Sequence, residues 1–427
     1  MSPVANKVSR PAFGPRGLYK VGEIPPLGHV PDRMYAWTIR RERHGPPETS
    51  MLVEVVPTWR IAEDEVLVFV LAGGVNYNGI WAALGKPISP FDVHNVPYHI
   101  AGSDAAGVVW AVGSRVRRWR VGDEVIVHCN QDNGDDEECN GGEPLLSQSQ
   151  RIWGYETPDG SFAQFCRVQC RQVMPKPEHL TWEEAACYAL TLATAYRMLF
   201  GHPPHIVKPG ENVLVWGASG GLGVFGVQLA VASGATAIGI VSEASKVDYV
   251  KALGAKTVIN RNDFDCWGTM PTVSSPRYNA WIKEARRFGK AIWDVTGKRD
   301  VDIVFEHPGE QTFPVSTLIV KRGGMVVFCG GTTGPNITFD ARYVWMRQKR
   351  IQGSHFANLK QASAANQFVI DRRIAPCMSE VFSWEQIAAA HTKMWQNQHK
   401  PGNMAVLVNA PRVGLRNFGD TVRAAGA

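Results

Sequence analysis

A glycine-rich turn is the part of this sequence whose residue types and spacing point most directly to chemistry. It lies between two apolar runs, 213–216 and 224–232. The turn consists of Gly217, Ala218, Ser219, Gly220, Gly221, Leu222 and Gly223. Glycines let a backbone turn sharply and approach a pyrophosphate, whose charge is stabilised at the N-terminus of the following helix. A glycine triplet alone would also fit a plain strand–helix connection, but the strand and helix around this one favour dinucleotide binding.

The residues after the next strand indicate which dinucleotide is bound. Units that select NAD usually end their second strand on an acidic residue, which binds the ribose hydroxyls. Here Ser242 occupies that position, Glu243 follows, and Lys246 is placed to meet a 2′-phosphate. Arg261 follows the third strand. The pattern predicts NADPH rather than NADH, with Glu243 as the residue that argues for the alternative.

A doubly wound parallel sheet is the framework that this turn requires. The segments 236–242 and 256–260 are predicted strands separated by a helix over 244–254, which completes a βαβαβ unit with the first strand. Further strands are predicted at 301–307, 324–334 and 350–356, and a long helix at 276–297. These segments place the second half of the chain in the α/β class.

The first half of the chain has a different character. Residues 1–33 are rich in proline and glycine and predict an extended arm. Short strands and glycine turns from 34 to 129 then indicate a partly open β-barrel. The acidic stretch 130–150 predicts a long surface loop, which is either solvated or a subunit contact. A helix is predicted over 180–199, with Thr181 as its cap and Glu184 at the capping-box position.

Composition restricts the classes of function. The chain has 427 residues, 44% of them hydrophobic and 20% charged, with a formal net charge of +6. This mild positive charge without a long basic run gives no support for nucleic-acid binding. No apolar leader and no run long enough to span a membrane is visible. The eight cysteines form no CxxC pair, so reduced thiols and a cytoplasmic location are expected.

Several blocks of the sequence resemble the medium-chain dehydrogenase/reductase superfamily. They are GSDAAGVV (102–109), VGDEVIVHC (121–129), the helix 181–199, WGASGGLG (216–223) and KALGAK (251–256). In zinc alcohol dehydrogenases of that superfamily, the segment matching 102–104 carries a histidine and a glutamate of the metal site. Ser103 stands there in this chain, and the cysteine quartet for structural zinc is missing. The resemblance therefore implies a zinc-free reductase with no metal ligands.

The resemblance narrows to the crotonyl-CoA carboxylase/reductase family. GVNYNGIW (74–81), QRIWGYET (150–157), VDIVFEHPG (301–309) and RYVWMRQKRIQGSHFAN (342–358) carry it. It implies an α/β enzyme with an N-terminal arm and GroES-like catalytic domain at 1–200, an NADPH-binding Rossmann domain at 201–362, and a segment at 363–427 that returns to the catalytic domain. It also implies reductive carboxylation of crotonyl-CoA with CO2 in the ethylmalonyl-CoA pathway, and a homotetramer built as a dimer of dimers.

The same resemblance implies the residues that hold CO2. Asn78 and His355 would donate to its oxygens, Glu156 would hold an ordered water, and Tyr155 would shield the enolate from solvent. From the sequence alone, each also has a structural interpretation, such as a turn-forming Asn78 or a packed Tyr155. Matched to the family, Arg342 suits the 3′-phosphate of CoA and Tyr343 can stack on its adenine.

Two other inferences depend on the family match. Residues 328–334, with Cys329 and Gly330, are expected beside the nicotinamide. Asp136 and Asn140 in the acidic loop are candidates for a contact between subunits. Two rival functions stay open at this point: an enoyl-CoA reductase that protonates instead of carboxylating, including one that acts mainly on acrylyl-CoA, and a non-catalytic NADPH-binding protein.

Overall fold

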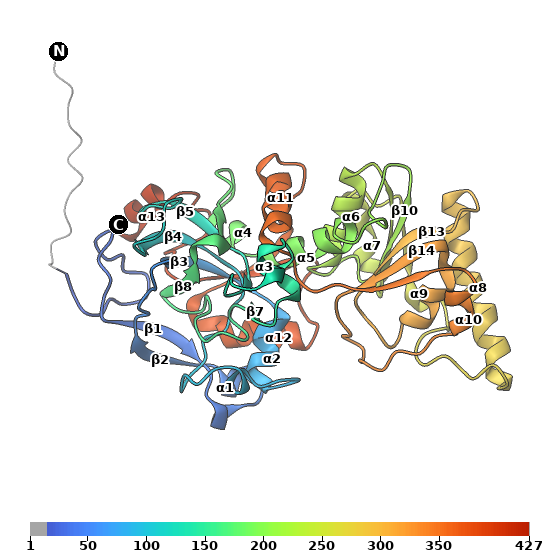
Figure 1. Ribbon diagram of the computed structural model, residues 1–427, viewed down its shortest axis with the longest axis horizontal. Helices are drawn as coiled ribbons and strands as arrows, with labels where there is room; N and C mark the ends of the chain where they lie inside the picture. The colour runs from blue at the N-terminus through green and yellow to red at the C-terminus, as the bar shows by residue number, and fades with distance from the viewer. Residues whose placement is uncertain (1–14, 427) are drawn as a thin grey trace, which may run out of the picture.

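Two β-sheets lie beside each other along the long axis of the molecule (Figure 1). The structure is a computed structural model that describes residues 15–426. The first sheet has seven strands in the order β16-β17-β3-β4-β5-β9, with β8 also paired to β3. Its strands are β3 Glu65–Val75, β4 Ala105–Val112, β5 Glu124–Val127, β8 Phe165–Gln169, β9 Val173–Pro175, β16 Met378–Phe382 and β17 Asn403–Leu407. Strand β3 is apolar and buried along almost its whole length because β4, β8 and β17 all pair with it.

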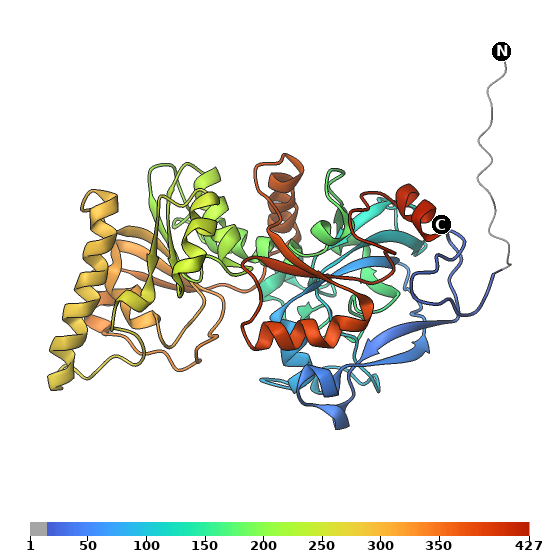
Figure 2. The ribbon, with the colours of Figure 1, turned by 180° about the vertical axis from the view of Figure 1, so that it is seen from behind.

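Two small hairpin-like pairs extend this half of the molecule. Strand β1 (Arg33–Thr38) pairs antiparallel with β2 (Leu52–Pro57), and β6 (Asn130–Gln131) pairs with β7 (Arg151–Ile152). The helices on this side are α1 Pro47–Ser50, α2 Tyr77–Leu84, α3 Glu137–Asn140, α4 Trp182–Ala185, α12 Ile387–Trp395 and α13 Phe418–Ala425. Figure 2 shows the C-terminal part of the chain, in red, packed on this side of the molecule.

The second sheet is parallel and has six strands in the order β12-β11-β10-β13-β14-β15. They are β10 Asn212–Val215, β11 Thr236–Val241, β12 Thr257–Asn260, β13 Val301–Glu306, β14 Val320–Phe328 and β15 Arg350–Gly353. In sequence order this is 3-2-1-4-5-6, the arrangement of a Rossmann dinucleotide-binding fold. The structure therefore confirms the predicted fold class, an α/β chain in which a partly open β-barrel is joined to a Rossmann sheet.

Helices cover the six-stranded sheet and connect it to the first sheet. They are α5 Ala189–Phe200, α6 Gly223–Ala232, α7 Val247–Ala252, α8 Pro276–Thr296, α9 Phe313–Ile319, α10 Ala341–Trp345 and α11 Leu359–Ile370. Helix α5 packs against both α6 and α11, and its Leu190 N–H donates to Asp104 beside β4, so it connects the two halves. One apolar core runs from the barrel into the Rossmann sheet, and a second lies under α8 and α9. Within residues 15–426, no helix is both long and apolar enough to cross a membrane.

The predicted helix over 180–199 is in fact two helices, and the break has a tertiary cause. Thr181 and Glu184 form the expected capping box at the start of α4. The chain leaves helical geometry after Ala185 and re-enters it at Ala189. The carboxylate of Asp104, which directly precedes β4, accepts a hydrogen bond from the Leu190 backbone N–H at 2.8 Å. The barrel thus satisfies one of the free N–H groups that every helix start exposes.

Three other expectations were too simple. The sequence of 151–168 predicts a return to strand, but only its ends, β7 and β8, are strand. The acidic stretch 130–150 contains β6 and α3 and is not purely a loop, while strand β16 was missed. The residues after 409 predict a polar tail, but they contain α13, whose cap is the Asn417 side chain, which accepts from the Asp420 N–H. These elements are short, so tertiary contacts rather than local periodicity decide them.

Candidate active site

The glycine turn lies between β10 and α6, as predicted, and its backbone is shaped for a phosphate. Gly217 has a φ of +54°, and a Cβ there would lie 2.8 Å from the His307 ring. A Cβ on Gly223 would lie 2.2 Å from the Gly217 carbonyl oxygen, so glycine is required where the turn closes onto the helix. At Gly220 the nearest atom to such a Cβ is 3.4 Å away. The turn therefore leaves its outer backbone open while its inner side is tightly packed, which fits a pyrophosphate at the start of α6.

Contacts from both halves of the chain hold this turn. The Gly402 N–H donates to the Ser219 carbonyl at 2.9 Å, so the segment before β17 lies along the turn. The Nε2–H of His307 donates to the Trp216 carbonyl at 3.0 Å. Burial lowers the pKa of His307 to about 4, so this imidazole is neutral. Sequence reasoning assigned no role to His307; its position directly after strand β13 was the available signal.

The other predicted cofactor residues lie along one edge of the six-stranded sheet. Ser242 follows β11, Arg261 follows β12, and Cys329 with Gly330 follows β14. Because parallel strands end at a common edge, these positions lie on the same side as the glycine turn. Burial raises the pKa of the Cys329 thiol to about 12, so it stays protonated. Arg261 donates to the Gln311 side chain at 3.4 Å.

Glu243 and Lys246 form an ion pair at 2.7 Å. The hydrogen bond from Lys246, and then its charge, lower the pKa of Glu243, so the carboxylate is ionised at neutral pH. The acidic residue that argued for NADH is therefore engaged by the lysine that was predicted to meet a 2′-phosphate.

A second cluster forms on the barrel side around Asn78. Asn78 is in the first turn of α2 and is 7% exposed. Its Nδ2 donates to the hydroxyl of Ser103 at 3.3 Å, and Ser103 is fully buried. Ser103, which stands where zinc alcohol dehydrogenases carry a metal-site histidine, instead holds the Asn78 amide. Within the described residues, no three His, Cys, Asp or Glu side chains lie together as metal ligands.

The turn 152–156 packs against this cluster. Tyr155 is 7% exposed, its ring lies 6.3 Å from that of Trp81 on α2, and its hydroxyl donates to the Ile88 carbonyl at 2.9 Å. Burial raises the pKa of Tyr155, which keeps the phenol neutral. Glu156 accepts from the Ile152 N–H at 2.7 Å, which closes the turn. The structure thus places the turn that carries Tyr155 and Glu156 against α2, the helix that carries Asn78.

His355 approaches from the Rossmann side, on the segment that leads from β15 to α11. Its ring packs on Phe356 with centroids 4.2 Å apart. Two residues later, the Ala357 carbonyl accepts from His128 Nε2 at 2.7 Å, which ties the segment to the barrel. His355 is exposed overall, but desolvation of its ring, followed by the nearby Arg197 guanidinium, lowers its pKa. This shift favours the neutral imidazole, which carries one N–H donor.

Arg342 and Tyr343 are not brought to this cluster within one chain. They are in α10, which lies with α8 and α9 at the outer end of the Rossmann half, far along the long axis from α2 and β7 (Figure 1). The Arg342 guanidinium is paired with the Asp340 carboxylate at 2.6 Å. Tyr343 lies 5.2 Å from the Arg347 guanidinium.

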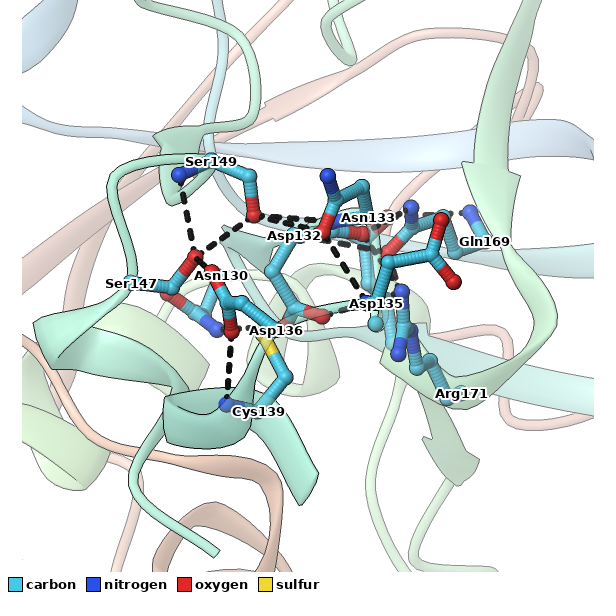
Figure 3. A network of polar contacts seen from close by, with 12 residues as sticks. Asn130, Asp132, Asn133, Asp135, Asp136, Cys139, Ser147, Ser149, Gln169 and Arg171 are labelled. Atoms are coloured by element: carbon cyan, nitrogen blue, oxygen red, sulfur yellow. Dashed lines mark hydrogen bonds and ion pairs between the residues drawn. The ribbon is translucent and has the colours of Figure 1, made fainter. Parts of the chain in front are cut away.

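The acidic stretch 130–150 is held by hydrogen bonds within itself and by bonds from Gln169 and Arg171 to Asp132 (Figure 3). Asp136 caps α3 by accepting from the Cys139 N–H at 2.9 Å, and it also accepts from the Ser147 hydroxyl. Asn140 donates to the Asp136 carbonyl at 2.9 Å. Both candidates for a subunit contact are therefore engaged inside this stretch.

Comparison with known proteins supports the assignment made from the sequence. Residues 62–178 match the family model described as an alcohol dehydrogenase GroES-like domain, and residues 221–371 match the one described as a zinc-binding dehydrogenase. A crotonyl-CoA carboxylase/reductase from Cereibacter sphaeroides is 71% identical over 410 residues, which are 96% of this chain and 95% of the relative.

Solved structures agree with these matches. A crotonyl-CoA carboxylase/reductase superimposes with a TM-score of 0.94 at 76% identity and covers 96% of both chains. The 2-octenoyl-CoA carboxylase reductase CinF, solved in complex with NADP and 2-octenoyl-CoA, has a TM-score of 0.85 at 38% identity and covers 93% of this chain and 92% of its own. The Rossmann strand order, the glycine turn and the extent of these matches lead to one conclusion. This chain belongs to the crotonyl-CoA carboxylase/reductase family of the medium-chain dehydrogenase/reductase superfamily.

Proposed function

We propose that this protein is an NADPH-dependent crotonyl-CoA carboxylase/reductase, which converts crotonyl-CoA, CO2 and NADPH into ethylmalonyl-CoA and NADP⁺. The observation that carries the proposal is identity with a protein of that name along almost the entire chain. A match over 410 of the 427 residues spans most of both the barrel and the Rossmann sheet. The proposal places the reaction in the cytoplasm and in the ethylmalonyl-CoA pathway.

The glycine turn 217–223, with Ser242, Lys246 and Arg261, would hold NADPH. When bound, this cofactor supplies the hydride for the β-carbon of the enoyl thioester. Lys246 already carries a carboxylate partner, Glu243, which a 2′-phosphate must share or displace. We expect Cys329 and Gly330 to border the nicotinamide, because they follow β14 at the edge where this fold binds its ligands.

The remaining chemistry depends on what meets the enolate. After the β-carbon is reduced, negative charge develops at the α-carbon and the thioester oxygen. Carboxylation then forms a bond between the α-carbon and CO2, whereas simple reduction adds a proton at the same carbon. CO2 is neutral and apolar, so a small number of oriented donors must hold it in place of water.

Asn78 and His355 are proposed as those donors. The Asn78 amide has two N–H groups, of which one faces Ser103. The lowered pKa of His355 favours the neutral imidazole, which can donate its N–H to CO2 and is a weaker acid than an imidazolium. A charged imidazolium beside the enolate would instead be an acid able to protonate it.

Tyr155 and Glu156 are proposed to control water at the site. The Tyr155 hydroxyl is committed to the Ile88 carbonyl, so it is not free to deliver a proton to the enolate. Its buried ring is suited to exclude solvent. Glu156 uses one oxygen to close its own turn, which leaves the other available to hold an ordered water.

Arg342 and Tyr343 are proposed to bind CoA in an assembled enzyme. Their position at the outer end of the Rossmann half favours service to the site of a neighbouring subunit. A homotetramer, built as a dimer of dimers, would allow that arrangement. In such a site the Asp340 carboxylate must release or share the Arg342 guanidinium when the 3′-phosphate binds.

A direct test offers the enzyme crotonyl-CoA and NADPH, with and without bicarbonate plus carbonic anhydrase, and identifies the products by mass. We expect ethylmalonyl-CoA to dominate at saturating CO2. Dominant butyryl-CoA under that condition would refute the carboxylase assignment and favour a simple enoyl-CoA reductase. Parallel assays with acrylyl-CoA would establish the acyl preference, and absence of turnover with any enoyl thioester would favour a non-catalytic NADPH-binding protein.

A further inference from the structure

The turn that presents Tyr155 and Glu156 is fastened by a chain of side-chain hydrogen bonds that begins in β8. The Arg167 guanidinium contacts the Asp159 carboxylate, with Nε to Oδ2 at 3.0 Å. The Thr157 hydroxyl donates to the other carboxylate oxygen of Asp159 at 2.7 Å. The same hydroxyl accepts from the Gly154 N–H at 3.2 Å. Each step has a defined donor, because a carboxylate only accepts and a backbone N–H only donates.

Because this chain of hydrogen bonds is buried, it restricts the backbone shape of the turn. Asp159 is 2% exposed and Thr157 is 9% exposed. The backbone carbonyl of Asp159 also accepts from the Trp153 indole N–H at 3.0 Å. Asp159 therefore binds the segment on both sides of Tyr155. A buried polar group is costly when it loses its partner, so the turn has little freedom to adopt another shape.

Gly154, which donates to the Thr157 hydroxyl, also sets the position of this turn relative to the Asn78 cluster. Gly154 has a φ of +74°, and a Cβ there would lie 2.0 Å from the Gly102 carbonyl oxygen. Gly102 directly precedes Ser103, whose hydroxyl holds the Asn78 amide. The Thr157 hydroxyl thus holds the residue whose backbone sets the separation between Tyr155 and the Asn78 donor.

We propose that Thr157 and Asp159 are positioning residues for CO2 capture, which act by holding Gly154 against Gly102. They touch neither substrate nor cofactor in this role. Their effect is to keep the ring of Tyr155 and the carboxylate of Glu156 aligned with Asn78, so that the enolate meets CO2 and not water. This inference rests on the proposed carboxylase function, and it extends that function to residues outside the predicted site.

The decisive variant is Thr157→Val, which keeps the volume and branching of threonine but removes the hydroxyl. With crotonyl-CoA and NADPH saturating, we expect the ratio of ethylmalonyl-CoA to butyryl-CoA to fall about fivefold or more, and the KM for CO2 to rise by a similar factor. NADPH oxidation without CO2 should stay within about twofold of the parent, because the hydride-transfer step does not use the turn. Thr157→Ser, which restores the hydroxyl, should recover most of the parental ratio.

Thr317→Val is a matched control, because Thr317 is also buried and its hydroxyl also has a local partner, the Pro314 carbonyl at 2.9 Å. It should leave the product ratio unchanged. A parental ratio and KM for CO2 in Thr157→Val would overturn the proposal, as would equal losses of carboxylation and CO2-free NADPH oxidation. If Thr157→Val does not fold, Thr157→Ala replaces it. Failure of both while Thr157→Ser folds would also overturn the proposal, since the hydroxyl would then serve folding alone.

The parent enzyme separates this inference from the function on which it rests. If the parent itself forms only butyryl-CoA, the carboxylase assignment fails. If the parent carboxylates and the Thr157 variants keep its ratio, only the positioning role fails.

Discussion

Replacement of Asn78 by leucine tests the central feature of the proposed site, a donor aimed at CO2. Leucine has nearly the same length as asparagine and fits an apolar wall, but it has no N–H. Asn78 is 7% exposed, and one of its two N–H groups faces Ser103 at 3.3 Å. The substitution therefore removes the second N–H, which is the one available to CO2, without adding charge to the pocket.

The size of the effect follows from the loss of one neutral hydrogen bond. Such a bond contributes about 0.5–1.5 kcal/mol net. If it acts only on CO2, the ratio of carboxylation to protonation should fall by about 2- to 13-fold. Loss of the hydrogen bond to Ser103 should lower the free energy of unfolding by a similar amount, about 0.5–1.5 kcal/mol. NADPH oxidation should change less than the product ratio.

The assay measures both products by mass while NADPH oxidation is followed by absorbance, over a range of CO2 concentrations. Ser103→Ala is the control: it removes the partner of Asn78 but keeps the amide, so its product ratio should shift less. Equal loss of carboxylation and of NADPH oxidation in Asn78→Leu would refute the reasoning. That result would make Asn78 a general catalytic or folding residue.

Other substitutions test the cofactor turn, a buried acid and the acidic stretch. Gly223→Ala should raise the KM for NADPH at least about tenfold, because the new Cβ would lie 2.2 Å from the Gly217 carbonyl oxygen and must displace the turn. Steady-state kinetics measure this KM, and an unchanged value would contradict the prediction. Burial raises the pKa of Glu306 from 4.5 to about 7, so the folded state binds its proton more tightly and stability from this group is lost as pH rises from 4.5 to about 7. Urea unfolding at about pH 5 and about pH 7.5 measures the difference in unfolding free energy between the parent and Glu306→Gln. We expect the advantage of the parent to shrink at the higher pH, by up to about 3 kcal/mol. A difference that does not depend on pH would be inconsistent with a buried acid. Glu143→Gln removes the charge that faces the buried Arg197 guanidinium at 3.0 Å. We expect it to lower the free energy of unfolding by about 1–3 kcal/mol in the same urea assay. An unchanged free energy of unfolding would mean that the pair is only a surface contact.

Local sequence patterns predicted the elements that are determined within a few residues. The glycine turn, the strand before it and the helix after it were recognisable because turn geometry and apolar periodicity are local properties. The capping box of Thr181 and Glu184 was predicted for the same reason and is present. The interruption after Ala185 could not be foreseen, since it depends on a carboxylate 86 residues away from Leu190 in sequence.

The candidate site shows the same limit more strongly. Residue patterns in this chain gave no reason to place Asn78 beside Ser103 or Trp81 beside Tyr155. Those residues meet because the end of β3 pairs with the start of β4, with Gly73 opposite Ala105, and because Gly154 packs on Gly102. The candidate site residues were proposed through resemblance to a family, because a family match carries information about tertiary arrangement that residue patterns lack.

By itself, then, the sequence determined that a parallel sheet with a phosphate-binding turn is present and that the charge after its second strand favours NADPH. Only the tertiary structure decided that Lys246 is shared with Glu243, that His355 is tied to the barrel through Ala357, and that Thr157 holds Gly154 in place. The physical reason is that turns and helices are stabilised by neighbours in the chain. Hydrogen bonds and pKa shifts instead depend on which distant groups folding brings together and which of them it removes from water.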